Sequence, residues 1–353
     1  MKMNHFIKAS PHKNSQLISY AVALALGASL APQLAQADDE SDLLFPYVVK
    51  DANRTTVITV ITPDVGGIAD QMHIQYWTKS TTAANTAACE PSSSTMVTTE
   101  NDVVTFDTAG LFGTPTVPAL FGDTTNAAPL GASISFAGPR HGYLVIAFDD
   151  NETDSNSDAD NNVGYWVEVD FANGGAHGDI AYDSDDNDNG DFSDQDGHTV
   201  LQNTTIGGSI TKDPERPVVF WPTSLVSTAF TVTPLGTVME NSDNNTVVLQ
   251  VFNTSGQQGA YDRNENGIDG TVPQTVRCVG RLTPAQLMPG VVINAAWAAQ
   301  GGWGWLVNLG DGDTNSESNT IDLDAAVYQV DTSNAAGSGR FMSNAWRIVS
   351  DDD

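Results

Sequence analysis

A run of acidic and amide side chains between residues 185 and 196 has the spacing of a cation-binding loop. Oxygen-bearing side chains stand at loop positions one, three and five, and Gly190 follows at position six, where a sharp turn needs a residue without Cβ strain. A hard cation such as calcium needs about six to eight oxygen ligands on one concave side. The predicted ligands are Asp185, Asn187, Asn189, Asp191 through its carbonyl, Ser193 and Asp196.

This segment resembles the calcium loops of EF-hand, dockerin and thrombospondin type-3 proteins. The resemblance covers about twelve residues and implies the loop's ion chemistry. EF-hands and dockerins continue into a helix after position twelve, whereas residues 197–201 (GHTVL) are typical of a strand. Asp196 is also a shorter ligand than the glutamate usual at that position. The helical surroundings of those families therefore do not carry over.

A second segment repeats the pattern at residues 262–270. Its predicted ligands are Asp262, Asn264, Asn266 and Asp269, with Gly267 at position six. Position twelve is Pro273, so a complete cage requires ligands from elsewhere in the chain. A third segment, residues 311–317, has the spacing but lacks the glycine. The predicted cofactor is Ca²⁺; the alternative for all three segments is solvated turns, because sequence rich in Asp and Asn gives partial matches by composition.

The whole chain is strongly acidic, with 44 Asp and Glu against 14 Lys and Arg and a net charge of -30. A nucleic-acid-binding protein needs a basic surface, so we predict no nucleic-acid partner, and anionic membrane surfaces are disfavoured for the same reason. Much of the excess charge lies between residues 149 and 196. Clustered carboxylates repel one another, and bound cations would order such loops. Adaptation to a saline environment is the other explanation of the acidity.

The first 37 residues have the features of a secretory signal peptide. Lysines precede an apolar run at residues 17–31, and Ala35-Gln36-Ala37 is a small-x-small cleavage site. Cleavage near Ala37 would place the protein in the periplasm, at the cell surface or in the extracellular space. An uncleaved anchor is the alternative, but the run is shorter than the roughly 20 residues that a membrane span requires, and we predict no span.

Export determines how the two cysteines are interpreted. Thiols outside the cytoplasm are oxidised, so Cys89 and Cys278 are predicted to form a disulfide, with two buried free thiols as the alternative. In the chain-entropy model, closing so long a loop stabilises the fold by at most about 5 kcal/mol.

The remaining sequence is a pattern of strands and turns. The side chains of residues 165–171 alternate in type along the chain, which predicts a strand with one buried and one solvent-exposed face. Residues 247–251 show the same alternation. Residues 55–62 and 142–148 are apolar or β-branched on both faces and predict central strands. Further strands are predicted at residues 73–77, 230–233, 291–294, 303–309 and 341–349. Helical evidence is limited to a start at Thr283, followed by Pro284 and Gln286.

This pattern predicts an all-β fold of one or two immunoglobulin-like or jelly-roll β-sandwiches with long acidic loops. The predicted organisation is a signal peptide (1–37), an N-terminal β-sandwich that carries the first calcium loop (38–198), a connector (199–217) and a C-terminal β-sandwich that carries the second (218–353). The Asp/Asn-rich sequence that ends at His198 and the proline-flanked segment 213–217 define the connector.

No catalytic motif stands out. The sequence contains no G-x-S-x-G elbow, H-E-x-x-H pair or P-loop, and the predicted mature chain keeps four widely spaced histidines. His177 and His198 flank the first calcium loop and could hold zinc, although solvated loop histidines are the favoured interpretation. A carboxylate pair for glycoside hydrolysis could be present among the many acids, but the sequence does not identify it.

One aromatic segment suggests a glycan platform. Trp303 and Trp305 fall on one face of the predicted strand, where the intervening glycines would leave the rings uncovered. Core tryptophans against close-packed backbone are the alternative.

Together these features predict a secreted, calcium-stabilised surface or extracellular-matrix protein that acts by binding, adhesion or assembly rather than by catalysis. A carbohydrate-binding, lectin-like module is the second possibility, and a secreted hydrolase with an unidentified carboxylate pair is the third. The partner classes besides calcium ions are a cell-surface polymer, a glycan or another secreted protein.

Overall fold

The computed structural model of the chain describes residues 42–62, 70–98, 102–112, 119–121, 133–149, 162–183, 215–236, 239, 243–253, 258–292, 295–309, 325–334 and 339–348. All of these residues belong to one compact unit, Gln36–Asp353. The predicted signal peptide, the first calcium loop (185–196), the third (311–317) and most of the predicted connector lie outside the described residues. The division into two domains stays a prediction.

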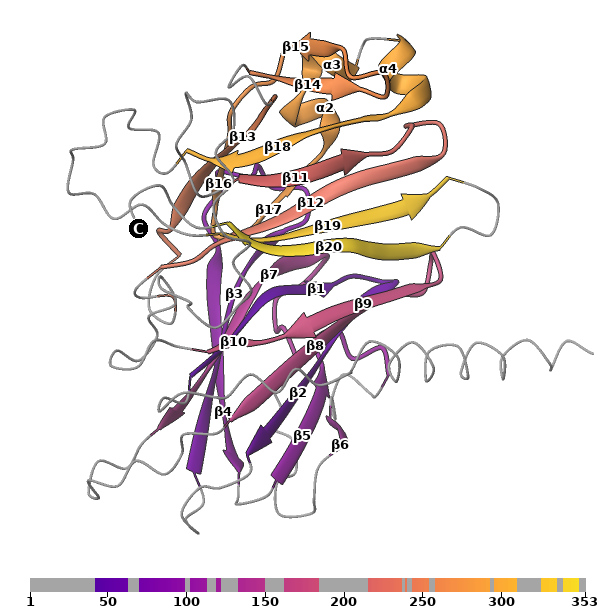
Figure 1. Cartoon of the computed structure of the whole chain (residues 1–353). Coiled ribbons are helices and arrows are strands. Elements are labelled where there is room, and N and C mark those ends of the chain that lie inside the picture. Colours follow the sequence, from indigo (N-terminus) through magenta and orange to yellow (C-terminus); the bar gives the residue numbers. More distant parts are fainter. Residues whose placement is uncertain are drawn as a thin grey trace, which may run out of the picture. The chain divides into compact units, whose positions relative to one another are not determined.

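The described fold is all-β, built from antiparallel sheets with few helices (Figure 1). The strands of the first part of the chain are β1 (Leu43–Lys50), β2 (Arg54–Thr62), β3 (Asp70–Ser80), β4 (Glu90–Thr98), β5 (Asp102–Asp107), β6 (Ala119–Phe121), β7 (Arg140–Asp149), β8 (Val163–Asp170), β9 (Gly175–Ile180) and β10 (Tyr182–Asp183). Those of the second part are β11 (Glu215–Phe220), β12 (Val226–Pro234), β13 (Thr246–Phe252), β14 (Gly259–Asp262), β15 (Gly267–Asp269), β16 (Gln274–Arg277), β17 (Gly280–Leu282), β18 (Gly302–Asn308), β19 (Ala325–Ser333) and β20 (Arg340–Ile348). The helices with described bounds are α2 (Pro284–Leu287), α3 (Pro289–Val292) and α4 (Ala295–Gln300).

Three sheets are described. A ten-stranded sheet has the order β4-β3-β7-β1-β2-β5-β6, with β8 on β2, β9 on β8 and β10 on β1. A six-stranded sheet has the order β15-β14-β18-β13-β16, with β11 also on β18. A four-stranded sheet has the order β17-β12-β19-β20. The strands of the ten-stranded sheet precede residue 184 and those of the other two follow residue 214, so no described sheet mixes strands from the two parts of the chain.

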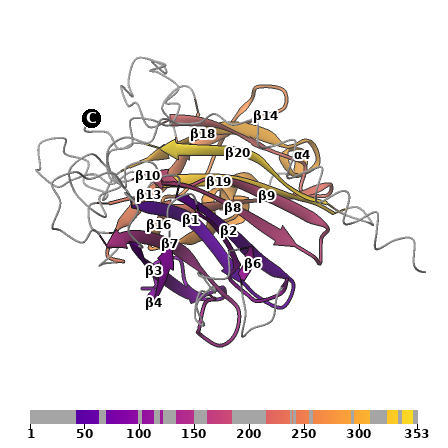
Figure 2. The same ribbon diagram turned by 90° about the horizontal axis from the view of Figure 1, so that it is seen from below.

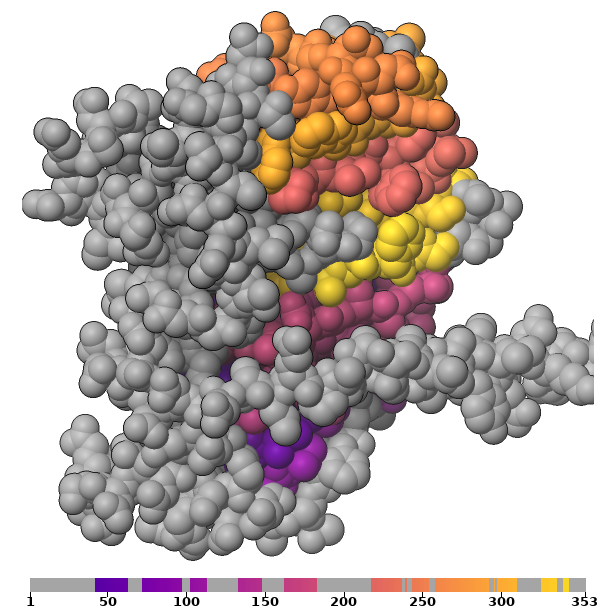
Figure 3. Space-filling model, viewed as in Figure 1, coloured from indigo at the N-terminus to yellow at the C-terminus, as the bar shows by residue number. Residues whose placement is uncertain are grey.

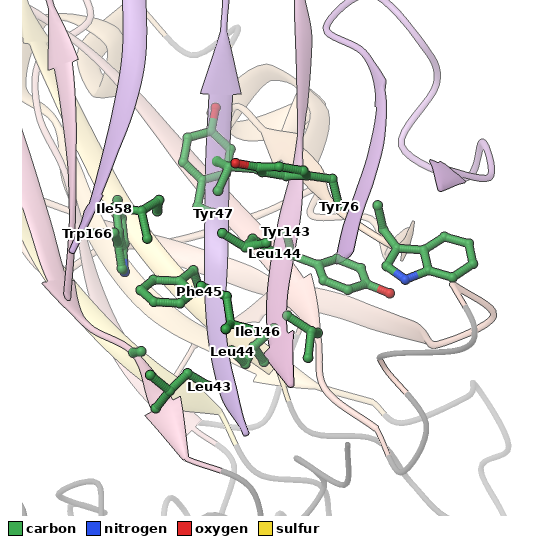
Figure 4. Close-up of a cluster of buried hydrophobic side chains, with 14 of the residues drawn as sticks. Leu43, Leu44, Phe45, Tyr47, Ile58, Tyr76, Tyr143, Leu144, Ile146 and Trp166 are labelled. Carbon is green, nitrogen blue, oxygen red and sulfur yellow. The ribbon is translucent and has the colours of Figure 1, made fainter. Parts of the chain in front are cut away.

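A large apolar core holds the ten-stranded sheet together. Figure 4 shows side chains of β1, β2, β3, β7 and β8 converging in it, among them Phe45, Ile58, Tyr76, Leu144 and Trp166. All of these side chains are buried. Burying a large apolar side chain stabilises a fold by roughly 1.5 to 3 kcal/mol, so this cluster is a main source of stability.

Most of strand β19 in the four-stranded sheet is buried on both faces. Alternate residues of β19 point to opposite sides: Ala326 and Tyr328 join the core of the ten-stranded sheet, whereas Ala325 and Val327 join a second core with the six-stranded sheet. Figures 1 and 2 accordingly both place β19 and β20 between β18 on one side and β9 on the other. Two sheets that enclose a common core fit a β-sandwich.

Most predicted strands are present, and the exceptions have physical causes. The predicted strand at residues 291–294 is wrong, because Val291 and Val292 end the short helix α3, which begins at Pro289. Proline's fixed φ suits the first turn of a helix. The predicted helix start at Thr283 is confirmed, and Thr283 and Gln286 form a capping box.

Strand β8 keeps the predicted alternation, but polar groups lie on its buried face. Trp166, Glu168 and Asp170 are buried, while Tyr165 and Val167 are partly exposed and Phe171, which follows the strand, is exposed. Buried carboxylates need charged or hydrogen-bonded partners, and these two have an arginine from the far end of the chain, described below. The described residues contain no helix long and apolar enough to cross a membrane.

Candidate functional site

The second predicted calcium loop is the turn of a tight hairpin. Strands β14 and β15 pair antiparallel, with Tyr261 opposite Gly267. At the base of the turn, Asp262 Oδ1 accepts the backbone N–H groups of Asn264 (2.7 Å) and Asn266 (2.9 Å). The amide Nδ2 of Asn266 donates to Asp262 Oδ2 at 3.0 Å. These hydrogen bonds, the side-chain one first, lower the pKa of Asp262 below its ordinary value.

The structure brings three of the four predicted ligands together and leaves the fourth farther along the hairpin. Asp262 is connected to Asn266 through both side chains and to Asn264 through a backbone N–H, whereas Asp269 is exposed and pairs with Gly259 across the ladder. Gly267 does not make the turn: the left-handed residue is Glu265, at φ 64°. The glycine at position six, which the calcium-loop pattern uses for its sharp turn, is therefore not the residue that forms the turn in this segment.

In two other aspartates, Asp51 and Asp170, a single Oδ1 likewise accepts two backbone N–H groups, and both have an arginine beside them. Asp107 divides its contacts between two oxygens, which accept the N–H groups of Ala109 and Phe112, and it has no described ion pair. Asp51 Oδ1 accepts two backbone N–H groups, and its Oδ2 lies 2.6 Å from Arg54 Nε. Asp170 Oδ1 accepts the N–H groups of residues 172 and 173, and its Oδ2 lies 3.2 Å from Arg340 Nη1. Within the part of the chain that the structure describes, Asp262 forms no ion pair. Of Asp51, Asp170 and Asp262, Asp262 is thus the one without an ion pair among the described residues.

The aromatic segment lies on the outward face of the six-stranded sheet. Tyr261 pairs with Trp303 across β14 and β18, and their rings stack with centroids 4.9 Å apart and planes 29° from parallel. Trp305 meets Trp303 edge to face at 6.4 Å. On the other side of Trp303, β11 presents Val219, which is 47% exposed. The rings therefore pack on one another and do not lie side by side as a flat platform.

The intervening glycines do not uncover the rings, contrary to the prediction. Gly302 and Gly304 face inward, where a Cβ on Gly302 would collide with Trp297 and one on Gly304 with Val251. The period of a strand is two, so residues between outward-facing tryptophans necessarily face the core. These glycines serve close packing beneath the aromatic face.

The predicted disulfide between Cys89 and Cys278 is present, with Cα atoms 6.2 Å apart. It joins the residue before β4 to the β16–β17 connection across a sequence separation of 189 residues. Asp243 lies beside it: Oδ2 accepts the N–H of Cys89 at 2.6 Å, and Oδ1 pairs with Arg277 Nη2 at 3.1 Å. The two sulfur atoms are bonded to each other, so this carboxylate and the sulfurs do not form a metal site through thiolates.

A buried lysine strengthens the same junction. Lys79 Nζ donates to the carbonyls of Asn85 (2.8 Å), Ala87 (3.0 Å) and Arg277 (3.0 Å), so all three of its protons can be used. Burial lowers the pKa of Lys79 to about 8, against an opposing contribution from Asp243. The N-terminal and C-terminal parts of the chain therefore share a covalent and a hydrogen-bonded link at one place.

The most strongly connected charged cluster among the described residues was not predicted from the sequence, and we call it the Glu168 cluster. Glu168 is fully buried on β8, and its Oε1 lies 2.5 Å from Arg340 Nη1 on β20 and 3.7 Å from Arg54 Nη1 on β2. Arg340 also reaches Asp170, and His177 Nε2 on β9 lies 3.3 Å from Glu168 Oε2. The members of the Glu168 cluster are Arg54, Glu168, Asp170, His177 and Arg340.

The backbone is shaped to admit this contact. A Cβ on Gly175 of β9 would collide with the backbone of Arg340, so only glycine allows β9 and β20 to approach this closely. Figure 3 shows the yellow C-terminal strands directly beside the magenta segment that contains β9. The one sequence signal was the placement of Glu168 and Asp170 within an otherwise apolar strand; their partner, Arg340, lies 170 or more residues away.

His177 is not the solvated loop histidine that was predicted. It lies on β9, is buried, and its ring meets Trp166 edge to face at 6.0 Å. Burial lowers the pKa of His177, although the nearby Glu168 opposes the shift. His198, its predicted companion in a zinc site, lies outside the described residues. Glu168 and His177 are both buried, so in this structure the pair is not accessible to a substrate.

The buried histidines predict lower stability in acid. Burial, assisted by the neighbouring cations Lys79 and Arg54, lowers the pKa of His141 to about 3. The unfolded chain then binds the proton first, so stability falls as pH drops below about 6.5, by about 1.4 kcal/mol per pH unit for this histidine. Asp179 acts in the opposite sense, because burial raises its pKa to about 6 and acid relieves that cost.

Replacing His141 with phenylalanine isolates this term while keeping a ring against Tyr47. We expect the difference in unfolding free energy between His141→Phe and wild type to shift in favour of the variant by about 2 kcal/mol between pH 7.5 and pH 5. Urea denaturation at both pH values measures the shift. A difference that does not change with pH would contradict the assignment of His141 as a buried neutral group.

The comparisons with known proteins give no relatives: no family model, no curated protein and no solved structure matches the chain.

Proposed function

We propose that this chain is a secreted, calcium-stabilised protein of the cell surface or extracellular matrix that acts by binding or assembly. The observation that supports this proposal best is the Asp262 turn. Its carboxylate is fixed by backbone N–H groups, has the side-chain amide of Asn266 beside it, and lacks the arginine that accompanies Asp51 and Asp170. A bound cation would supply the missing positive charge.

The acidic chain as a whole supports the same proposal. A net charge of -30 disfavours the compact state through self-repulsion, and cations bound only by the folded chain offset that repulsion. In the Asp262 turn, Asn266 now donates its Nδ2 to Asp262; a rotated amide would present its oxygen to a cation instead. Extracellular calcium sites typically bind in the range of about 10⁻⁴ to 10⁻³ M, which suits a secreted protein.

The binding part of the proposal rests on the outward face of the six-stranded sheet. Val219 exposes 47% of its surface, and Trp303 is partly exposed between Val219 and Tyr261. Exposed apolar surface of this kind is typical of interaction sites. Tyr261 directly precedes Asp262, so a cation that orders the turn would also order the edge of this face.

The proposal also includes the type of β-sandwich and the cellular location of the protein. The two cores on either side of the four-stranded sheet support a pair of stacked sandwiches of immunoglobulin-like or jelly-roll type. The Cys89–Cys278 disulfide supports maturation in an oxidising compartment. The proposed partners are calcium ions together with a cell-surface polymer, a glycan or another secreted protein.

The proposal is tested by calcium titration of an Asp262→Asn variant. This substitution keeps an oxygen that can accept the N–H groups of Asn264 and Asn266 but removes the negative charge. We expect isothermal titration to show one calcium fewer per chain than wild type, with the strand content unchanged by circular dichroism.

Asp51→Asn is the matched control, because Asp51 caps an equivalent turn but already has Arg54. We expect this variant to bind as many calcium ions as wild type. If Asp262→Asn keeps the full number of ions, the second loop is a solvated turn; if wild type binds none, the calcium proposal fails.

The two other functions remain predictions. The stacked rings of Tyr261 and Trp303 give no separate support to a flat glycan platform. Among the described carboxylates, Glu168 and Asp170 share Arg340 in a buried position, which gives no separate support to a hydrolase.

A further inference from the structure

Strand β4 is an edge strand of the ten-stranded sheet. It pairs with β3 from Thr98 to Glu90, and no described strand pairs with its other side. In an antiparallel ladder, residues alternate between pointing both backbone groups at the partner and pointing both away. About four or five of the nine residues of β4 therefore present a backbone N–H and C=O outward.

The other long edges carry protecting features over much of their length, whereas among the described residues β4 has them only at its start. Strand β11 carries Glu215, Arg216 and Pro217, and β20 is approached along part of its length by β9. Charge, proline and covering strands are the usual means by which proteins prevent edge-to-edge pairing. In β4, Glu90 and Pro91 stand at the start, and the following seven residues, 92–98 (SSSTMVT), carry neither charge nor proline.

This lack of charge is unusual in so acidic a chain. Glu90, the single charged residue of β4, pairs with Arg140 at 2.5 Å, so the strand as a whole is nearly neutral. Two copies of a chain with a charge of -30 repel each other over most of their surface. The electrostatic repulsion between two copies is therefore smallest at a neutral edge strand, which can pair through its backbone groups.

We propose that two copies of this chain pair antiparallel through β4, so that the ten-stranded sheet continues across a twofold axis. The inference rests on the assembly part of the proposed function and names its partner as a second copy. It is independent of calcium binding, which the titration above tests separately.

The side chains of β4 suit a second copy better than a different strand. A twofold axis places each strand against itself, so the Ser/Thr row of one copy faces the Ser/Thr row of the other, and such cross-strand hydroxyl pairs stabilise a ladder. Ser93 and Thr95 are exposed. The Oγ of Ser94 is shielded from solvent but has no hydrogen-bond partner among the described atoms. A paired strand would bring it a second row of hydroxyl groups.

Sedimentation velocity of the intact chain tests the proposal. We expect a monomer–dimer equilibrium whose dissociation constant falls roughly tenfold or more between about 0.05 M and 1 M sodium chloride, because salt screens the repulsion between copies. The double variant Ser93→Asp/Thr95→Asp places like charges on the paired edges and should remain monomeric at both salt concentrations.

Ser224→Asp/Gln300→Asp is the matched control, because it adds the same charge at exposed positions outside the ten-stranded sheet and should still dimerise. Hydrogen exchange of wild type gives a readout that needs no variant: amide exchange in β4 should slow about tenfold as dimer replaces monomer. A monomer at high salt and high concentration would overturn the proposal. Dimers that persist in Ser93→Asp/Thr95→Asp, or β4 amides that exchange equally fast in monomer and dimer, would also overturn it.

Discussion

Replacing Arg340 with methionine is expected to lower the free energy of unfolding by about 3 to 5 kcal/mol, which is the usual cost of removing one partner of a buried ion pair. Arg340 Nη1 lies 2.5 Å from Glu168 Oε1 and 3.2 Å from Asp170 Oδ2, and the side chains of Arg340 and both carboxylates are buried. Without the guanidinium, Glu168 is left with Arg54 at 3.7 Å as its remaining arginine. Urea denaturation followed by tryptophan fluorescence measures the loss.

Two further variants separate the charge effect from packing. Glu168→Gln combined with Arg340→Met removes both charges, so its loss should be well below the sum of the two single losses. Arg263→Met alters an exposed arginine without a described ion pair and should change stability by less than about 0.5 kcal/mol. A loss below about 1 kcal/mol for Arg340→Met would show that the Glu168 cluster does not hold β20 against β8 and β9.

Removing the disulfide by Cys89→Ser/Cys278→Ser should destabilise the chain by up to about 5 kcal/mol, because a sequence separation of 189 residues gives the unfolded chain much entropy to regain. The loss acts on the unfolded state, so we expect the strand content of the folded variant to stay the same. The Lys79 hydrogen bonds and the Asp243–Arg277 pair remain at the junction and should keep the two parts together under native conditions. The urea midpoint at neutral pH measures the loss.

Reductant provides the internal control for this second result. A strong thiol reductant with urea should lower the wild-type midpoint towards that of Cys89→Ser/Cys278→Ser, and it should leave the variant's midpoint unchanged. Equal midpoints for oxidised wild type and the variant would mean that the bond does not restrict the unfolded chain.

Much of the fold could be predicted because its strands have local signatures. The alternation of Val247, Leu249 and Val251 gives three fully buried side chains on β13, and the apolar run at residues 142–148 lies within β7. The capping box at Thr283 was equally local. By contrast, residues 291–294 are β-branched and apolar, which favours a strand, but Pro289 and the packing of Val291 into the second core favour a short helix.

The candidate site was predictable only in part, because its decisive contacts are long-range. The pairing of Cys89 with Cys278 followed from there being two cysteines in a chain predicted to be exported. The hairpin at Asp262 was predicted as an ion loop, and its geometry as a self-capped turn depends on strand pairing that spacing alone does not encode. The Glu168 cluster needs Arg340, which β20 brings to β8 from far along the sequence. A local sequence pattern does not indicate a contact between residues so far apart in the chain.

The central claim is that calcium stabilises this fold, and its most direct test is the melting temperature of the intact chain in millimolar calcium and in excess chelator. Calcium at about a hundred times its dissociation constant should add about 2.7 kcal/mol, which raises the melting temperature by about 4 °C for a chain of this size. An equal concentration of magnesium should raise it less, because magnesium gives up its water ligands reluctantly. The same melting temperature in calcium and in chelator would contradict the claim and would leave the acidic segments as solvated turns.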